Sequence, residues 1–234
     1  MRSVRVEGMS DERFEPRVDP RPHDSHWPVA LWPPADGVRL TGTFVELAPA
    51  TVDDARELRI ALDHDHVWQH LAGGPLPDDS TARGWVTSVL ERGWFPWTVR
   101  LLRDAGERHA GHLVGWTSYL EIAPNDARLE IGNTAYDPGV WGSVVNPECK
   151  LLLLTYAFDE LHMGRVQLKT DIRNHRSQQA IARLGATYEG VLRRYQRRAD
   201  GSVRDTVMFS ITAEEWPGVR QRLVDRVSAY DVPA

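Results

Sequence analysis

The chain has 234 residues, of which 41% are hydrophobic and 26% are charged, and its formal charge at pH 7 is −5. This length and composition predict a globular protein with one core, and the negative charge argues against a general nucleic-acid-binding protein. Cys149 is the only cysteine, which excludes an intramolecular disulfide. No N-terminal apolar run of the signal-peptide type is present, so we expect a cytoplasmic protein that does not act at a membrane.

The N-terminal residues differ in composition from the rest of the chain. Six of the 15 prolines fall within the first 34 residues, among charged residues and without helical or strand periodicity. Residues 1–37 therefore predict a proline-rich extension, and residues 38–234 predict the folded domain. Trp27 and Trp32 would expose a large apolar area in a disordered tail, so we expect them to dock on the domain or on a second subunit of a homodimer.

Regular patterns begin at residue 38. "VRLTGTFVEL" (38–47) predicts a strand, "TVDDARELRIALD" (51–63) a helix capped by Thr51, and "STARGWVTSVLERG" (80–93) a helix that ends at Gly93. Three apolar runs that are typical of strands follow at 95–103, 112–122 and 128–136. This part of the chain therefore predicts antiparallel strands that follow two helices.

A loop next leads into a strongly apolar helix. Asn146 is expected to be its N-cap and Pro147 its first residue, and Glu148 suits the positive end of the helix dipole. Such a helix start is a ready anion site. Phosphate-binding loops, however, usually place glycine where the backbone approaches the ligand, and Gly142 is followed here by Ser143, Val144 and Val145.

The remaining pattern predicts a strand at 164–172, a helix at 174–185 that begins at Asn174, and two strands at 188–211 around an Asp200-Gly201 turn. The order of elements predicts an α/β protein with a mixed sheet. The last two strands carry a basic cluster, which is either a solvated hairpin face or a contact for an anionic ligand. Its members are Arg193, Arg194, Arg197, Arg198 and Arg204.

The strings "LEIGNTAYDPGVWGSVVNPECKLLLL", "LKTDIRNHRSQQAIARLGATYEGVLRR" and "DGSVRDTVMFSI" resemble the GNAT superfamily of acyl-CoA N-acyltransferases, in particular its ribosomal-protein N-terminal acetyltransferases. The resemblance covers roughly residues 38–216. It implies the GNAT fold, a mixed and mostly antiparallel sheet with flanking helices, splayed between the strand of Glu130 and the strand of Lys169. Acetyl-CoA would lie in that gap as co-substrate, without a metal.

The family's pyrophosphate loop resembles Gln/Arg-x-x-Gly-x-Gly/Ala, which places Val144 where the family tends to keep its central glycine. Either the loop adopts a conformation that valine tolerates, with weaker binding, or the cofactor site has been lost. If Val144 holds a positive φ, Val144→Gly should tighten acetyl-CoA binding. The acetyl-CoA contacts that the resemblance implies are Ile131, Gly132, Trp141, Gly142, Ser143, Val144, Val145, Asn146, Asn174 and Ser177.

The resemblance also implies the catalytic groups. Glu130 would deprotonate the amine, although a strand carboxylate can instead face solvent or pair with Arg128 or a neighbouring strand. Backbone N–H groups around Ile131 and Gly132 would polarise the thioester carbonyl. Many relatives use a tyrosine near the sulfur at the position of Ile181; its absence leaves Ser177 as the candidate polar group, or as an ordinary early-helix hydroxyl. Asn174 can bind pantetheine, cap its helix, or do both.

Two other groups of residues have alternative interpretations. The segment "DHDHVWQH" places His64, His66 and His70 at a spacing from which a metal site can be built, but it also matches a family helix start that needs no metal. Trp68 would then line the acceptor side, as a substrate contact, or pack in the core. Cys149 lies in the first turn of its helix and is interpreted as a buried structural thiol.

Two functions follow from these patterns. One is an acetyl-CoA-dependent N-acetyltransferase that acts on a primary amine, either a protein N-terminus or a small molecule. The other is a non-catalytic GNAT-fold module that binds a ligand or partner and has a degenerate acetyl-CoA loop. Titration with acetyl-CoA distinguishes the two.

Overall fold

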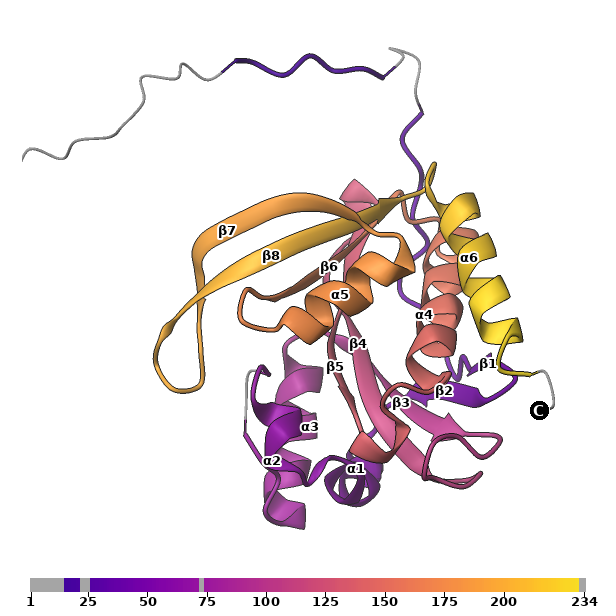
Figure 1. Ribbon diagram of the computed structural model, residues 1–234, viewed down its shortest axis with the longest axis vertical. Helices are drawn as coiled ribbons and strands as arrows, with labels where there is room; N and C mark the ends of the chain where they lie inside the picture. The colour runs from indigo at the N-terminus through magenta and orange to yellow at the C-terminus, as the bar shows by residue number, and fades with distance from the viewer. Residues whose placement is uncertain (1–14, 22–25, 72–73, 232–234) are drawn as a thin grey trace, which may run out of the picture.

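A computed structural model describes residues 15–21, 26–71 and 74–231. Its sheet has eight strands in the order β1-β2-β3-β4-β5-β6-β8-β7 (Figure 1). Every neighbouring pair is antiparallel except β5 and β6, which are parallel. The expected α/β mixed sheet is therefore confirmed. The strands are β1 Leu40–Thr41, β2 Val45–Pro49, β3 Phe95–Leu101, β4 Leu113–Ala123, β5 Arg128–Tyr136, β6 Arg165–Asp171, β7 Thr187–Arg197 and β8 Val203–Thr212.

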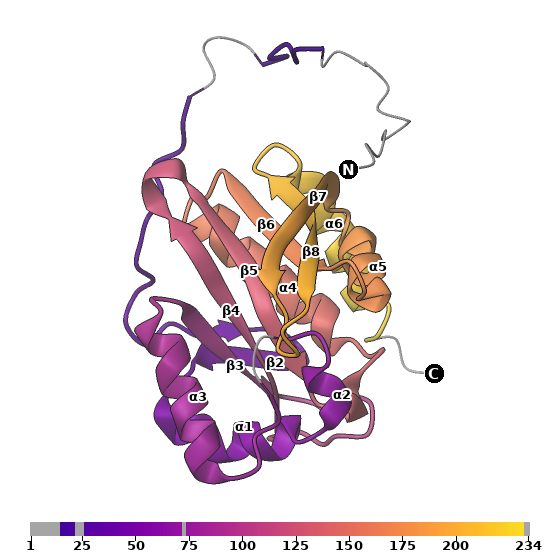
Figure 2. The same cartoon turned by 90° about the vertical axis from the view of Figure 1, so that its left-hand side faces the viewer.

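The helices form two groups on opposite sides of the sheet, as Figure 2 shows. Buried side chains of the first three helices form one apolar cluster with Trp116 and Ala135, and those of the last three form a larger cluster with the other face of the sheet. The α-helices are α1 Ala55–Leu62, α2 Asp65–Trp68, α3 Asp79–Glu91, α4 Val145–Thr155, α5 His175–Leu184 and α6 Trp216–Ser228. Short 3₁₀ turns occupy Val52–Asp54, Pro124–Asp126 and Pro138–Val140, and a π-turn extends α4 over Tyr156–Glu160.

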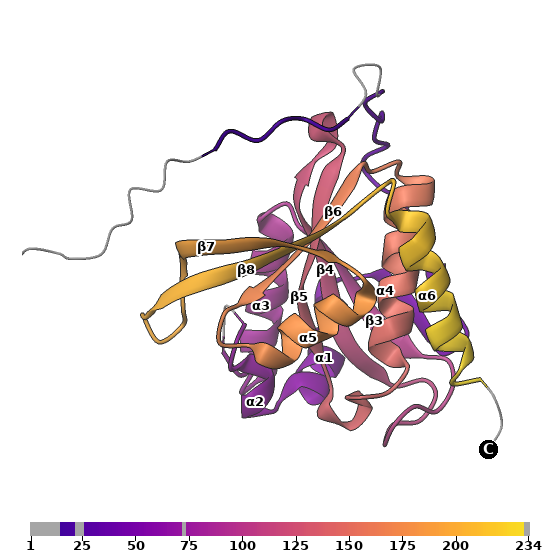
Figure 3. The same cartoon turned by 45° about the horizontal axis from the view of Figure 1, so that its top comes forward.

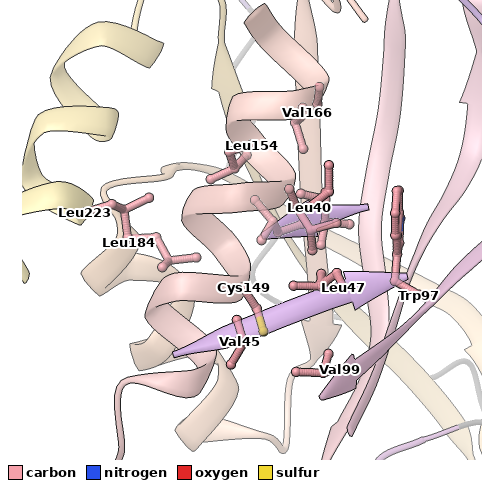
Figure 4. Close-up of a cluster of buried hydrophobic side chains, with 14 of the residues drawn as sticks. Leu40, Val45, Leu47, Trp97, Val99, Cys149, Leu154, Val166, Leu184 and Leu223 are labelled. Carbon is pink, nitrogen blue, oxygen red and sulfur yellow. The ribbon is translucent and has the colours of Figure 1, made fainter. Parts of the chain in front are cut away.

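Helix α4 lies at the centre of the larger cluster (Figure 4). Its Cys149 and Leu154 are fully buried, and burial raises the pKa of the Cys149 thiol to about 12. The expectation of a buried structural thiol is thus confirmed, because a thiol with this pKa forms almost no thiolate at neutral pH. Strand residues such as Val45 and Val99 lie on one side of the helix, and Leu184 and Leu223 from α5 and α6 lie on the other.

Two sequence-based assignments were wrong. Residues 38–47 form not one strand but a hairpin of β1 and β2, because the carboxylate of Glu148 accepts hydrogen bonds from the backbone N–H groups of Thr43, Phe44 and Val45 at 2.7, 2.7 and 2.8 Å. Glu148 therefore holds this turn. Helix α4 also begins earlier than predicted, at Val145, with Val144 in place of Asn146 as its N-cap.

Helix α6 was not predicted, although its signal is present in the sequence. Trp216, Val219, Leu223 and Val227 recur at helical spacing, and all four are buried. Within the described part of the chain, no helix has the length and apolar character needed to cross a membrane.

The described part of the N-terminal extension contacts the domain through Trp32. Its ring packs edge-on against Phe95 and Tyr119, with centroid distances of 5.9 and 6.5 Å, and the Leu31 N–H donates to the Leu161 carbonyl at 2.9 Å. Trp27 is 64% exposed. Trp32 thus docks on its own domain, whereas Trp27 does not, and the domain boundary at residue 37 stays a prediction.

We expect Trp32→Ala to lower the free energy of unfolding by about 1–3 kcal/mol, because the half-buried indole contributes apolar burial and edge-to-face contacts. The matched variant Trp27→Ala removes an exposed indole and should change stability by less than about 0.5 kcal/mol. Urea unfolding of the two variants checks the difference. Equal stabilities would show that the docked indole contributes nothing.

Candidate active site

The sheet opens between β5 and β6. Their parallel pairing ends at Glu130 and Gln167, although β5 continues to Tyr136 and β6 to Asp171. The expected splay between these strands is therefore confirmed, and Figure 3 shows β5 and β6 in the centre of the molecule with α5 alongside. A cavity of about 520 Å³ occupies this region, lined by β5, β6, the loop before α4, and α5.

Strand β5 is irregular where it borders the cavity. Its register with β4 shifts between Trp116 and Ser118, and Asn133 has a φ of 48°, which is uncommon for a residue other than glycine. The Asn133 Nδ2 atom is buried without a hydrogen-bond partner among the described residues. Bulges of this kind re-aim side chains and end regular pairing, and they are frequent next to active sites.

Glu130 is buried in the cavity wall. Its Oε2 atom lies 2.8 Å from Nζ of Lys169 and accepts a hydrogen bond from Nε2 of Gln167 at 3.2 Å. Burial raises the pKa of Glu130, and the Lys169 ammonium acts in the opposite direction. The carboxylate thus pairs with a neighbouring strand, one of the alternatives from the sequence, and also lines the cavity that its proposed role requires.

Lys169 is shared by a second carboxylate, that of Glu121 on β4. Gln167 also bridges the two acids, since its Nε2 atom donates to Glu121 Oε2 at 2.7 Å. Glu121 has a φ of 49°, and backbone strain of this kind clusters at functional sites. Burial opposes the charge of Lys169, but pairing with two carboxylates outweighs it and raises the pKa of Lys169. Sequence reasoning missed Glu121, because only the register of three strands places it beside Glu130.

The loop from Trp141 to Asn146 borders the cavity at the start of α4. The Trp141 indole donates to the Tyr136 carbonyl at 3.0 Å, and the Arg176 guanidinium lies 3.7 Å from the Trp141 ring centroid. The His66 ring meets this tryptophan edge-on at 5.1 Å. These contacts hold Trp141 between α2 and α5 and keep Arg176 at the loop.

Val144 does not have the positive φ that the family pattern suggested for this position. Its φ is −67°, and the left-handed residue of the loop is Gly142, with a φ of 76°. The side chains of Val144 and Val145 are buried in the core and do not line the cavity. The premise for tighter binding by Val144→Gly was therefore wrong: the loop has a conformation that valine tolerates.

We now expect Val144→Gly to destabilise the fold. It removes a buried side chain, worth about 1.5–3 kcal/mol, and adds backbone freedom worth about 0.5–1 kcal/mol, so the free energy of unfolding should fall by about 2–4 kcal/mol. Val144→Ala is the control that keeps the backbone restriction and should cost less. Denaturant unfolding measures both losses, and an unchanged midpoint for Val144→Gly would contradict the buried position.

Of the ten residues that the resemblance implied as acetyl-CoA contacts, the eight other than Val144 and Val145 line the cavity. Asn174 caps α5, since its side chain accepts the Ser177 N–H at 3.0 Å, so the capping role is confirmed and the cavity remains within reach. Ser177 and Ile181 line the cavity on the same helix.

Lys150 is a cavity residue that the sequence analysis missed, because it lies within an apolar helix. The side chain is buried, and its Nζ atom donates to Thr134 Oγ1 at 3.2 Å. Burial lowers the pKa of Lys150 to about 8, since no carboxylate is paired with it among the described residues.

Basic side chains outnumber acidic ones around this cavity. The acidic ones are Glu121 and Glu130, and the basic ones are Lys150, Lys169, Arg176, Arg183, Arg204 and Arg226.

The three histidines of the segment "DHDHVWQH" lie in different surroundings. His64 and His66 lie with their ring centroids 5.7 Å apart, and within the ranges that the structure describes no group of three or more metal-ligating side chains gathers. His70 lines the cavity. Trp68 is buried, with its indole donating to the Leu62 carbonyl at 2.8 Å, and it also borders a second, adjoining cavity. The alternative that Trp68 packs in the core is therefore observed, whereas a contact with the acceptor stays a prediction.

Comparison with known proteins agrees with this geometry. This chain is 30% identical over 113 residues to the "Uncharacterized N-acetyltransferase p20" of Bacillus licheniformis, an alignment covering 47% of this chain and 61% of that protein. It is 29% identical over 115 residues to the "Putative ribosomal N-acetyltransferase YdaF" of Bacillus subtilis (strain 168), covering 49% of this chain and 62% of that protein. The chain thus spans about three fifths of the length of these curated relatives.

A solved structure from T. thermophilus, described as a "putative acetyltransferase", is similar over most of its length. It is 35% identical, with a TM-score of 0.73, and the match covers 84% of this chain and 99% of that one. The family profile described as "Acetyltransferase (GNAT) domain" matches residues 45–187, which is more than half of the chain. The family expected from the sequence is confirmed: this chain belongs to the GNAT acetyltransferases.

Proposed function

We propose that this protein transfers an acetyl group from acetyl-CoA to a primary amine by direct attack of the amine on the thioester. The observation that carries this proposal is the cavity at the splay, which is lined by a buried carboxylate and by an excess of basic side chains. Acetyl-CoA is strongly anionic, and a cleft lined by one sign of charge favours a ligand of the opposite sign. The relative named a ribosomal N-acetyltransferase favours a protein N-terminus as acceptor.

In this proposal Glu130 accepts the proton of the attacking amine. A general base works best with a pKa near the working pH, and burial moves the pKa of Glu130 upward in that direction. Lys169 and Gln167 orient the carboxylate through their contacts with Oε2. Trp68 lies at the border of the adjoining cavity, where we place the acceptor.

Backbone donors of β5 would stabilise the oxyanion that forms on the carbonyl oxygen. Beyond Glu130, β5 pairs with no strand on its β6 side in the described part of the chain. Because neighbouring residues of a strand direct their N–H groups to opposite edges, one of Ile131 and Gly132 faces this open edge. When the carbon–sulfur bond breaks, its electron pair goes to the sulfur. We propose that the Ser177 hydroxyl on α5 donates a hydrogen bond to this thiolate, which then takes its proton from water.

The start of α4 and the nearby arginines would hold the phosphates. Backbone N–H groups at a helix start bind anions, and Gly142 supplies the left-handed turn that precedes them. Arg176 is held over Trp141 at this loop, and Arg183 lies two turns along the same helix. Lys150 would donate to a carbonyl of the pantetheine arm, beside Thr134.

The test is a steady-state assay that follows release of the CoA thiol with a panel of peptide amines and small amines. We expect thiol release that depends on the amine, together with a mass gain of one acetyl group on the acceptor. Binding of acetyl-CoA without transfer to any amine would instead support a ligand-binding GNAT module.

A further inference from the structure

A second cavity of about 560 Å³ adjoins the one at the splay. It lies between the segment around α2 and the end of the β7–β8 hairpin, which Figure 2 shows approaching α2. Four residues line both cavities: His70, Leu71, Gln196 and Arg204. The two cavities therefore meet at these four residues, and Arg204 lies at their border.

The lining of the second cavity contains one ion pair among the described residues. Arg198 makes two hydrogen bonds to the carboxylate of Asp171, at 2.5 and 2.8 Å; burial opposes ionisation of this acid, but the pair outweighs it and holds the pKa of Asp171 at about 2. Asp200 accepts the Ser202 N–H at 2.8 Å within the hairpin turn. Asp65, the third acid of the lining, is exposed at the start of α2.

Arg204 differs from these residues. It is half-buried on β8. Among the described residues, its buried Nε atom has no hydrogen-bond partner and no carboxylate lies within 4.0 Å of its guanidinium. Arginine stays charged in proteins, so removing it from water without an anion costs free energy. Burial lowers the pKa of Arg204, and the more distant Asp171 and Glu130 only partly offset this effect.

On the basis of the proposed transferase function, we propose that Arg204 binds a carboxylate of the acceptor, and that the acceptors are peptide amines with an acidic side chain at the N-terminal residue. Arginine recognises carboxylates through its planar fork of donors. Arg204 and Glu130 line the same cavity, so in this proposal one acceptor residue presents its carboxylate to Arg204 and its amine to Glu130. The exposed Arg193 and Arg197 of the same hairpin would attract an acidic peptide to this entrance.

The test uses two C-terminally amidated peptides that differ only in Asp or Asn as first residue, so that the side chain carries the only carboxylate. We expect the wild-type protein to acetylate the Asp peptide with a kcat/KM about ten- to hundredfold higher than the Asn peptide, as for loss of one charge-assisted hydrogen bond. Arg204→Gln should bring this ratio near one, mainly through KM of the Asp peptide. Arg204→Lys should retain part of it, and Arg39→Gln, which changes an exposed arginine at the opposite edge of the sheet, should leave it unchanged.

Three outcomes overturn the proposal. One is a wild-type protein that binds acetyl-CoA and shows no preference for the Asp peptide, or prefers spermidine to both peptides. Another is an unchanged ratio in Arg204→Gln. The third is a loss of acetyl-CoA affinity in Arg204→Gln of tenfold or more, which would make Arg204 a co-substrate contact. Absence of acetyl-CoA binding by the wild-type protein would instead be a failure of the proposed function itself, and calorimetry detects it separately.

Discussion

Replacing Glu130 by glutamine is expected to lower kcat by about 10²–10⁴-fold near neutral pH while acetyl-CoA affinity stays nearly the same. Glutamine keeps the shape of the side chain and cannot accept the amine proton. The variant should fold, because Glu121 remains as a partner for Lys169. In the wild-type protein, kcat should fall as the pH drops through the raised pKa of Glu130, because only the ionised carboxylate acts as a base.

The matched control is Glu121→Gln, which removes the other carboxylate on Lys169. If Glu130 is the base, this variant should retain most of its kcat and keep the acid limb of the pH profile. Steady-state kinetics of both variants across pH distinguish the two acids. Full activity of Glu130→Gln would remove Glu130 from the mechanism, and partial recovery at high pH, where more amine is neutral, would support it.

Glu148→Ala is expected to lower the free energy of unfolding by at least about 3 kcal/mol. The carboxylate accepts three backbone N–H groups of the β1–β2 turn, and each buried donor that loses its acceptor costs about 1–3 kcal/mol unless water replaces it. For a chain of this length the melting temperature should fall by about 6–12 °C. Differential scanning calorimetry measures this shift.

The control for Glu148 is Glu46→Ala, which breaks an exposed ion pair with Arg39 and should change stability by less than about 1 kcal/mol. Glu148→Gln should lower the melting temperature by an intermediate amount. Its amide oxygen still accepts from a backbone N–H group of the turn, but its NH₂ group cannot accept and faces another N–H donor. Equal melting temperatures for Glu148→Ala and Glu46→Ala would contradict the role of Glu148 in the turn.

The sequence pattern predicted an element correctly where the ends of that element depend on residues close to it in the chain. The run that became β5 was predicted with its observed ends, and α5 begins after Asn174 and ends before Gly185 as expected, because its cap and its glycine both lie within a few residues of it. Helix α6 was within reach of the same reasoning, since its buried residues follow helical spacing.

Distant contacts explain the errors. The turn within residues 38–47 depends on Glu148, which is about a hundred residues away, and a methyl group at Gly42 would lie 2.6 Å from its carboxyl carbon. The family pattern drew attention to Val144, but the positive φ falls on Gly142, which already is a glycine. A sequence pattern does not show which residue of a loop carries the unusual dihedral.

The candidate site was predicted only in part, because the positions of some of its residues also depend on contacts between distant parts of the chain. Glu130, Asn174 and Ser177 came from a motif and line the cavity together. Lys150 lies in an apolar helical run, where a lysine looks like an interruption of the core, and Arg204 was one of five similar arginines. Only packing shows that Lys150 faces the cavity, and that Arg204 lines both cavities with its Nε atom buried and without a hydrogen-bond partner among the described residues.

The central claim is that the cavity between β5 and β6 binds acetyl-CoA. Isothermal titration of the full chain with acetyl-CoA tests it most directly. We predict saturable binding of one acetyl-CoA per chain, retained in Glu130→Gln, because the carboxylate acts on the amine and not on the phosphates. No detectable binding by the wild-type protein at millimolar acetyl-CoA would contradict the claim.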